Sequence, residues 1–249
     1  MTGVLDVRAF TVGPVQENTY IVRAAGAGAD PGAGADAGAG APGPARSRAL
    51  LIDPGDEPER LLAAIDALGV EIEAILITHC HFDHIGAVAP LARATGAPVY
   101  CPRIERPALA DVMSWTPPGF GPFESYEAEH TLAGGERLSL AGLDVEVLFT
   151  PGHSPGHLTY VVGSPAHPAL LSGDVLFHGS VGRVDLPGGD WATLERSIGA
   201  LLDAYPDDTV VHPGHMGVTT LGRERESNPF LSELRTRGAR APVADTPAA

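Results

Sequence analysis

Short apolar runs and stretches of helical spacing alternate along the 249 residues of this chain. Runs rich in Val, Ile and Leu that are bounded by Gly, Pro, Asn or Asp are typical of strands. They predict strands at residues 5–12, 19–23, 49–52, 74–77, 98–100, 137–140, 143–149, 157–162, 169–171 and 209–211. Apolar residues at helical spacing predict helices at 57–68, 85–94, 191–204 and 228–235. We expect the second helix to be kinked or split near Pro90, and Asp190 to be the N-cap of the third.

Three segments lack such patterns. Residues 24–48 are almost entirely Ala, Gly, Pro and Asp, which offers no apolar surface to offset the entropy of ordering, so we expect a disordered insertion between two strands. Residues 102–128 read as an irregular loop that either covers a pocket or packs on its rim. Residues 238–249 read as a disordered tail, which leaves one domain over residues 1–237. The strands fall into two groups, each followed by helices, and this predicts two sheets packed face to face with helices outside.

The strongest chemical signal lies directly behind the run at 74–77. His79, His81, Asp83 and His84 place three imidazoles and a carboxylate within six residues. Neutral imidazole and carboxylate oxygen are ligands that Zn²⁺ and Fe²⁺ prefer. The spacing H-x-H-x-D-H sends successive side chains in different directions from one tight loop. This loop could therefore serve two adjacent metal ions.

Three further candidate ligands follow later strands in similar settings. His153, Asp174 and His215 each come soon after a short apolar or β-branched run, and each is preceded by Gly. Glycine permits the tight turn that lets a side chain point inward from a strand terminus. The sequence therefore predicts four strand ends that present polar ligands to one place.

With these residues in view, the sequence resembles the metallo-β-lactamase-fold hydrolases. Residues 78–84 match their signature, and His153, Asp174 and His215 match the later ligands in order. The segments 173–189, 213–220 and 222–230 most resemble the short glyoxalase II-type hydrolases, similar to hydroxyacylglutathione hydrolase, that lack an extra C-terminal helical domain. The resemblance implies an α/β (α+β) fold, a four-layer αββα sandwich with the metals at one edge between the sheets.

The resemblance also implies a ligand set for two divalent ions, with zinc favoured over iron or manganese. His79, His81 and His153 would hold one metal, Asp83, His84 and His215 the other, and Asp174 would bridge them. Asp83 and His84 are also assigned to catalysis, in which a metal-activated water attacks the substrate carbonyl. His157 would orient a ligand.

Substrate residues carry over less completely. Arg183 keeps the positive charge that contacts the thiol carrier in glyoxalase II proteins, and we assign Tyr160 to substrate binding as well. Asp185 and Gly217 stand where the long enzymes have Tyr. The expected function is hydrolysis of small acyl-thiol thioesters such as S-lactoylglutathione. The alternative is an iron-dependent persulfide dioxygenase that uses His79, His153 and Asp174; lactone or other metallo-hydrolysis ranks lower.

The amino-acid composition limits the kinds of molecule that this protein is expected to bind. The formal net charge of −15 argues against nucleic acid, which requires a basic surface, and all sixteen basic residues are Arg. Cys80 and Cys101 have no disulfide framework and indicate a reducing cytoplasm, with Cys80 facing away from the ligands. The first ten residues form no secretory signal, and no apolar stretch reaches the roughly 20 residues that span a bilayer. We therefore expect a cytoplasmic monomer or small homo-oligomer with a small-molecule substrate.

Overall fold

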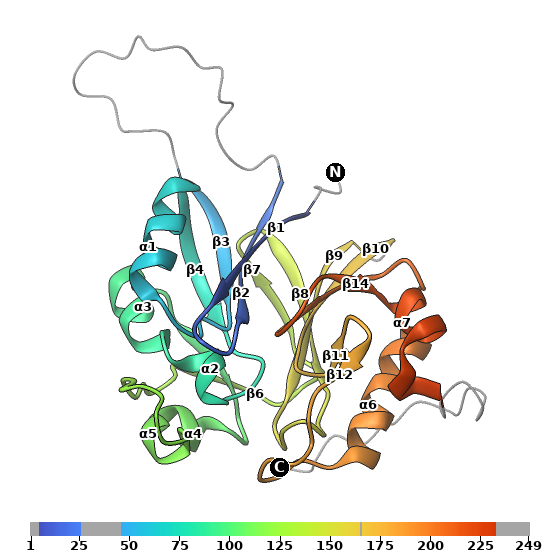
Figure 1. Cartoon of the computed structure of the whole chain (residues 1–249). Coiled ribbons are helices and arrows are strands. Elements are labelled where there is room, and N and C mark those ends of the chain that lie inside the picture. The colour runs from blue at the N-terminus through green and yellow to red at the C-terminus, as the bar shows by residue number, and fades with distance from the viewer. Residues whose placement is uncertain (1–4, 26–45, 165, 233–249) are drawn as a thin grey trace.

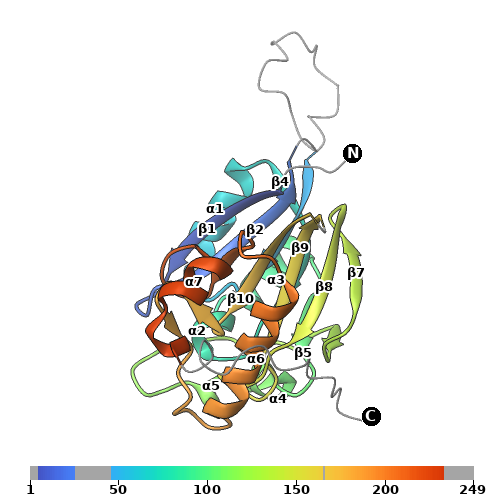
Figure 2. The same cartoon turned by 90° about the vertical axis from the view of Figure 1, so that its right-hand side faces the viewer.

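The computed structural model describes residues 5–25, 46–164 and 166–232. Two six-stranded sheets pack face to face, and helices cover the outer face of each (Figures 1 and 2). This is the four-layer αββα arrangement that the resemblance implied, so the predicted fold class is confirmed. In the described part of the chain, none of the helices is long and apolar enough to cross a membrane.

The first sheet has the order β1-β2-β3-β4-β5-β6, and its strands follow one another along the chain. The first three strands pair antiparallel, and the pairs from β3 to β6 are parallel. Parallel pairing brings the carboxyl ends of β3, β4 and β5 to the same edge. The strands are β1 (Leu5–Val12), β2 (Glu17–Ala24), β3 (Ser47–Ile52), β4 (Val70–Leu76), β5 (Val99–Pro102) and β6 (His130–Leu132).

The second sheet has the order β14-β13-β10-β9-β8-β7. Only the pair β10–β13 is parallel among these strands. A two-stranded ribbon, β11 (Leu176–Phe177) with β12 (Ser180–Val181), follows β10. The strands of the main sheet are β7 (Arg137–Leu140), β8 (Leu143–Phe149), β9 (Leu158–Ser164), β10 (His167–Gly173), β13 (Val210–Pro213) and β14 (Thr219–Thr220).

The helices flank the two sheets. Helices α1 and α3 lie against the outer face of the first sheet, and α6 and α7 against that of the second (Figure 1). The third predicted helix is confirmed with its cap, because the Asp190 carboxylate accepts a hydrogen bond from Thr193 N–H at 2.8 Å. The helices are α1 (Pro58–Ala67), α2 (Phe82–Ile85), α3 (Val88–Thr95), α4 (Arg106–Ala110), α5 (Val112–Trp115), α6 (Trp191–Ala204), α7 (Leu221–Ser227) and the 3₁₀ turn η1 (Pro229–Leu231).

Alternating side chains of the strands supply three separate apolar layers. On β3, Leu50 and Ile52 point into the core between the sheets, whereas Ala49 and Leu51 face the helices α1 and α3. On β10, Leu170 faces α6 while its neighbours face the first sheet. Because side chains alternate with a period of two, strands buried on both faces read as continuous apolar runs. The layers hold the two sheets in a fixed relation, and the ends of their strands form the site.

Several predicted elements differ from the observed ones. The predicted helix 85–94 is split, but the break lies at Gly86 and Ala87 rather than near Pro90. Pro90 sits in the first turn of α3, where a backbone N–H has no helical partner to lose. The segment 102–128 is not wholly irregular, because it contains α4 and α5. At the start of the predicted last helix, 228–235, the structure instead has the 3₁₀ turn η1, which follows the end of α7 at Ser227. Residues 233–235 lie outside the described residues.

The low-complexity insertion was predicted over residues 24–48. Ala24 belongs to β2, and Ser47 and Arg48 belong to β3, so its predicted ends were too wide. Residues 26–45 lie outside the described residues, as does the predicted tail at 238–249. The predicted strand 19–23 is longer than expected, because β2 already begins at Glu17.

Candidate metal centre

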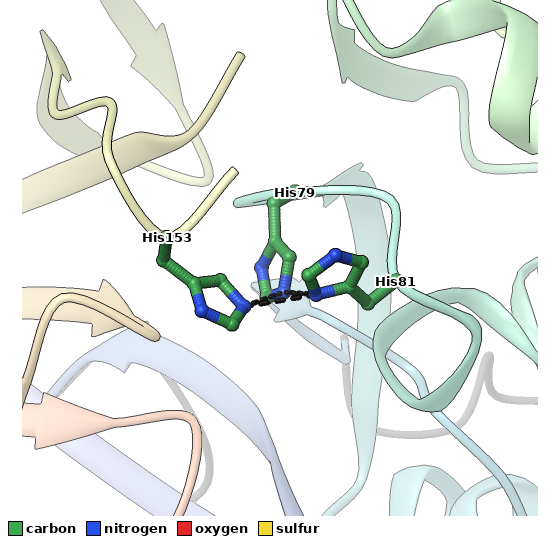
Figure 3. A group of neighbouring side chains, drawn as sticks. All are labelled: His79, His81 and His153. Atoms are coloured by element: carbon green, nitrogen blue, oxygen red, sulfur yellow. Dashed lines mark hydrogen bonds between the residues drawn. The ribbon is translucent and has the colours of Figure 1, made fainter. Parts of the chain in front are cut away.

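Seven predicted ligands meet where strands of both sheets end. His79, His81, Asp83 and His84 belong to the loop and short helix after β4. His153 follows β8, Asp174 follows β10, and His215 follows β13 in the second sheet. Figure 3 shows His79 and His81 approaching His153 from the opposite chain segment. The structure therefore brings together all seven side chains that the sequence singled out.

His79, His81 and His153, which we call the first group, direct three ring nitrogens at one point (Figure 3). His153 Nε2 lies 2.8 Å from His81 Nδ1 and 3.2 Å from His79 Nε2, and the latter two atoms are 3.1 Å apart. Three nitrogens around a tetrahedral Zn²⁺ would be separated by about 3.3 Å, given Zn–N bonds of about 2.05 Å. The spacing of the first group is close to that of a metal-binding triad.

Asp83, His84 and His215, which we call the second group, form an adjacent cluster. His215 Nε2 lies 3.3 Å from Asp83 Oδ2, and His84 Nε2 lies 3.9 Å from the same oxygen. The His84 side chain is fully buried, whereas those of Asp83 and His215 are 15% and 20% exposed. Solvent therefore reaches this group at Asp83 and His215.

Asp174 stands between the two groups. Its Oδ2 lies 3.4 Å from His153 Nε2 of the first group and 3.6 Å from His215 Nε2 of the second. Its Oδ1 lies 3.4 Å from His84 Nε2. A carboxylate that faces ligands of both groups at similar distances has the position of a bridge between two metals.

Two buried atoms at the centre have no hydrogen-bond partner among the described residues: His84 Nε2 and Asp174 Oδ1. Buried polar atoms normally have a partner, and each orphan costs free energy. Both atoms are lone-pair donors aimed at the space that the two groups share. A bound divalent cation would satisfy them, so the residues fit a two-metal centre.

Asp53 accounts for the orientation of His84. Asp53 Oδ2 accepts from His84 Nδ1 at 3.0 Å and from the Thr78 hydroxyl at 2.5 Å, while its Oδ1 accepts from Thr78 N–H at 2.7 Å. With Nδ1 carrying the proton, His84 Nε2 is left free as a ligand atom. Asp53, His79 and His84 also lie close enough to form a ligand group, but the Asp53 carboxylate is already engaged by these donors.

Two rings of the first group, His79 and His81, are held in their neutral form. Burial lowers the pKa of His79 well below its ordinary value, and the charges of His84 and His81 lower it further. Burial and the nearby His153 lower the pKa of His81 to about 4. These rings therefore present free lone pairs at neutral pH, as metal ligands must.

The second group has the opposite electrostatics. Burial lowers the pKa of His84, but the charges of Asp174 and Asp83 outweigh it and the net pKa is well above the ordinary value. The pKa of His215 is also raised. Burial lowers it, but the hydrogen bond to Asp83 and the charge of Asp174 outweigh burial. Burial raises the pKa of Asp174, yet the charges of His84 and His153 bring it far below the ordinary value.

His157 lies beneath the ligands rather than among them. Its Nε2 accepts from Asp174 N–H at 3.0 Å, its Nδ1 lies 3.1 Å from the Thr150 hydroxyl, and its ring stacks on His79 at 4.9 Å. Burial keeps its pKa well below the ordinary value, so the neutral ring can accept from Asp174. His157 thus contacts the backbone of Asp174 and the ring of His79, and its orienting role stays a prediction.

Glycine is required where the loops approach one another. At Gly173 φ is +47°, and an added Cβ would lie 2.4 Å from Thr78 Oγ1. At Gly214 an added Cβ would lie 2.3 Å from Asp174 Oδ1 and 2.7 Å from His84 Cε1. Gly173 therefore leaves space for Thr78 and His157, and Gly214 leaves space for the ligands Asp174 and His84.

The structure does not support the substrate-binding role assigned to Tyr160. Its side chain is fully buried between the sheets, and its hydroxyl donates to the Ile77 carbonyl at 2.6 Å. A residue held in this way braces the strand that leads to the metal loop and does not reach a substrate. Arg183 is exposed and pairs with Asp185 at 2.6 and 2.7 Å. Its backbone carbonyl lies 2.7 Å from His153 Nδ1, so the main chain of Arg183 also orients a ligand.

Sequence reasoning missed two buried acids behind the ligands. Asp53 was not among the predicted ligands, although it directly follows the predicted strand 49–52 and precedes Pro-Gly, a signal similar to that of the later ligands. Glu17 is fully buried, and its Oε1 lies 3.8 Å from His84 Nδ1. Burial raises the pKa of Glu17 well above its ordinary value. Cys80 faces away from the ligands as predicted, with its Sγ 3.5 Å from that of Cys101.

Residues 45–215 match the family model described as the metallo-beta-lactamase superfamily. The chain belongs to this superfamily. The match includes every one of the seven predicted ligands, and the fold and the metal-binding clusters agree with it. Its relatives support a metallo-hydrolase, and its His and Asp clusters agree with metal binding.

Two relatives and one solved structure place the chain within the superfamily. A probable metallo-hydrolase of Bacillus subtilis, YqgX, is 35% identical over 90% of this chain and 97% of its own length. The hydroxyacylglutathione hydrolase GloC of Haemophilus influenzae is 36% identical over 74% of this chain and 87% of its own length. The crystal structure of TTHA1623 in a di-iron-bound form is 42% identical, with a TM-score of 0.66, over 90% of this chain and 100% of that one.

Proposed function

We propose that this protein hydrolyses small acyl-thiol thioesters, of which S-lactoylglutathione is the model substrate. The observation that carries the proposal is the pair of ligand groups with Asp174 between them. The similarity to a hydroxyacylglutathione hydrolase over 74% of the chain supports the reaction class. The proposal includes a cytoplasmic location and zinc as the metal, since hydrolysis needs no redox-active ion.

The residues of the centre have two roles in this proposal: some would hold the metal ions, and others orient the residues that hold them. His79, His81 and His153 would hold one ion, and Asp83, His84 and His215 the other. Two divalent ions in such a site activate a water molecule and polarise the substrate carbonyl. Asp53 fixes the ring of His84, and His157 holds the backbone of Asp174, so the ligands are positioned before substrate arrives.

We place the apolar part of the substrate beside Asp83. A pocket lined by Val12, Pro14, Phe82, Phe120 and Phe123 includes Asp83 in its wall. The Phe82 and Phe120 rings are 4.6 Å apart between centroids. Arg183, exposed near the loop that carries Asp174, offers a positive charge for a carboxylate of the thiol carrier. The apolar wall adjoins Asp83 of the second group, and the main chain of Arg183 adjoins His153 of the first group. These two features suit an acyl-thiol with an acidic carrier.

The deciding experiment uses metal-loaded full-length protein. We expect protein reconstituted with Zn²⁺ under anaerobic conditions to release free thiol from S-lactoylglutathione. His153→Ala should abolish this release, whereas His167→Ala, the same change at an exposed position of the same sheet, should leave it intact. A β-lactam serves as a comparison substrate, and metal analysis identifies the ion in protein purified without chelators.

The principal competing reaction gives the opposite pattern. Zn²⁺ has no redox cycle, so a zinc-loaded dioxygenase would be inactive. Oxygen consumption with glutathione persulfide, seen only in iron-loaded protein and without thioester cleavage in any metal form, would establish a persulfide dioxygenase instead.

A further inference from the structure

Glu105 is a buried acid outside the seven predicted ligands. It follows β5 and immediately precedes α4, and its exposed fraction is only 8%. Although it stands at the N-cap position of α4, its side chain makes no capping hydrogen bond to that helix. The carboxylate is turned toward the metal centre instead, so helix capping does not explain it.

Three hydrogen-bond donors converge on this carboxylate. Glu105 Oε2 accepts from Cys80 N–H at 2.6 Å. Its Oε1 accepts from Gly156 N–H at 2.7 Å and from the Ser154 hydroxyl by a short hydrogen bond. Burying a carboxylate is costly unless donors replace its hydration, and hydrogen bonds to a charged group are among the stronger ones. The three donors therefore form a buried binding site for the Glu105 carboxylate.

The donors belong to the two loops that carry the first group. Cys80 stands between His79 and His81, and Ser154 directly follows His153. These loops come from different sheets, after β4 and after β8. One carboxylate thus ties together the chain segments that present all three imidazoles of the first group.

Gly156 makes this close approach possible. An added Cβ at Gly156 would lie 2.7 Å from Glu105 Cγ and 3.0 Å from its Oε1. A side chain there would push the carboxylate away from Ser154 and from the backbone of residue 156. The absence of a side chain at Gly156 therefore leaves the space that Glu105 occupies beside the His153 loop.

We propose that Glu105 is a positioning residue for the first metal site. Its carboxylate sets the separation between the loop of His79 and His81 and the loop of His153, and it thereby determines the metal affinity of that site. The second group is oriented through Asp53 and depends on Glu105 much less. This proposal rests on the two-metal centre of the proposed function, but not on the thioester substrate.

The test is the isosteric variant Glu105→Gln. Whichever way the amide is turned, its NH₂ faces a backbone N–H, that of Cys80 or that of Gly156, so one donor loses its acceptor. Loss of partners that orient metal ligands typically costs about 10–100-fold in metal affinity. We expect Zn²⁺ titration against a competing chelator to show this loss for one ion, with the other ion bound as in the unmodified protein.

Double variants identify which ion is affected. With His153→Ala, the change at Glu105 should add little further loss of affinity, because the first site is already disabled. With His215→Ala, it should remove the remaining tightly bound ion. Glu105→Asp keeps the charge but shortens the reach, and it should weaken the same ion if position rather than charge is what matters.

Glu136→Gln is the matched control. Both carboxylate oxygens of Glu136 accept backbone N–H groups, those of Ala133 and Gly134 at 2.8 Å, at the turn between β6 and β7. This variant should lose some thermal stability and retain both ions. Gly156→Ala provides a second route to the same displacement if Glu105→Gln does not fold, and it should also weaken one ion selectively.

Unchanged affinity for both ions in folded Glu105→Gln, or an equal loss at both sites, would overturn the proposal. These readouts require no turnover. A chain that binds two metals but cleaves no thioester would therefore refute the proposed reaction while leaving the role of Glu105 standing.

Discussion

The two ligand groups lie side by side but differ in composition and charge. The first group consists of three imidazoles, and burial and mutual repulsion hold the pKa values of His79 and His81 low. The second group combines two imidazoles with Asp83 and also faces Asp174, and these charges raise the pKa values of His84 and His215. One half of the centre is thus ready for a cation at neutral pH, whereas the other half holds protons that a cation must displace.

The two groups also differ in their supports. Glu105 joins the loops of the first group through backbone and hydroxyl donors, whereas Asp53 contacts a ligand ring of the second group directly. Each group therefore has its own buried acid. The comparison suggests that the two sites can be weakened independently, by changes that touch none of the seven ligands.

Changing Asp174 should have the largest effect, because its carboxylate lies between ligands of both groups. Asp174→Asn keeps the shape and the backbone N–H that His157 accepts, but removes the charge. We expect loss of both metals and a fall in turnover of about three orders of magnitude, since metal assistance contributes several kcal/mol to the barrier. Metal analysis and thioester assays check this. Asp144→Asn, an exposed change on β8, is the control, and two retained metals in Asp174→Asn would disprove the bridging role.

Asp53→Asn should weaken metal binding at the second site, whereas Glu105→Gln should weaken it at the first. In Asp53→Asn the amide oxygen can still accept from Thr78, but the NH₂ then faces His84 Nδ1 and the ring loses its acceptor. We expect the second site to bind metal about 10–100-fold more weakly while the first stays near its original affinity. Chelator competition measures both constants. Selective weakening of the first site would show that Asp53 acts through Thr78 and His79 instead.

A change of pH should distinguish the groups without mutation. Because the pKa values of His84 and His215 are raised, these rings are protonated below those values, and each displaced proton lowers metal affinity about tenfold per pH unit. Metal affinity at the second site should therefore rise with pH up to the raised pKa values. At the first site, two of the three rings should add no pH dependence between pH 6 and 8, since His79 and His81 are already neutral there. Metal titrations across this range test the difference, and parallel pH profiles would contradict it.

Arg183→Ala should have the smallest effect on the centre. The carbonyl that contacts His153 belongs to the main chain and remains, and the exposed ion pair with Asp185 contributes little to stability. We expect unchanged metal content and a KM raised several-fold with kcat nearly constant, because the guanidinium would bind ground state and transition state alike. Steady-state kinetics decide this. A fall in kcat at constant KM would place Arg183 in the chemistry.

The sequence predicted the parts of the centre that depend on residue type near strand ends. Ligands such as His79 and Asp174 stand out because a polar residue follows an apolar run in a glycine-bearing loop. Asp53 shows part of this signal, because it follows the apolar run 49–52, whereas Glu105 shows none. The role of both acids depends on donors 25 to 51 positions away in the chain, which the sequence does not reveal. Tyr160 shows the reverse error: the strand was predicted correctly, but which face of it points into the core is fixed only by sheet packing.

Short elements escaped prediction for a related reason. The two-residue strands β11, β12 and β14 contain too few positions to show a period of two, and they exist because neighbouring strands pair with them. The short helices α4 and α5 lie in a Pro-rich segment whose local signals favour turns. Elements built from repeated apolar positions, such as β4 and α6, were predictable because the pattern itself drives their burial.

The order of the strands has a consequence for how the protein is made. Every described strand of the first sheet precedes residue 133, and every described strand of the second follows residue 136. Four of the predicted ligands thus belong to the part of the chain synthesised first, and three to the part synthesised last. Neither part alone carries His79, His81 and His153 together, so metal capture by the first group must await the C-terminal half. During synthesis, the ligands of the first sheet would leave the ribosome before those of the second. Bound metal ions could connect the two sheets only after both had been synthesised.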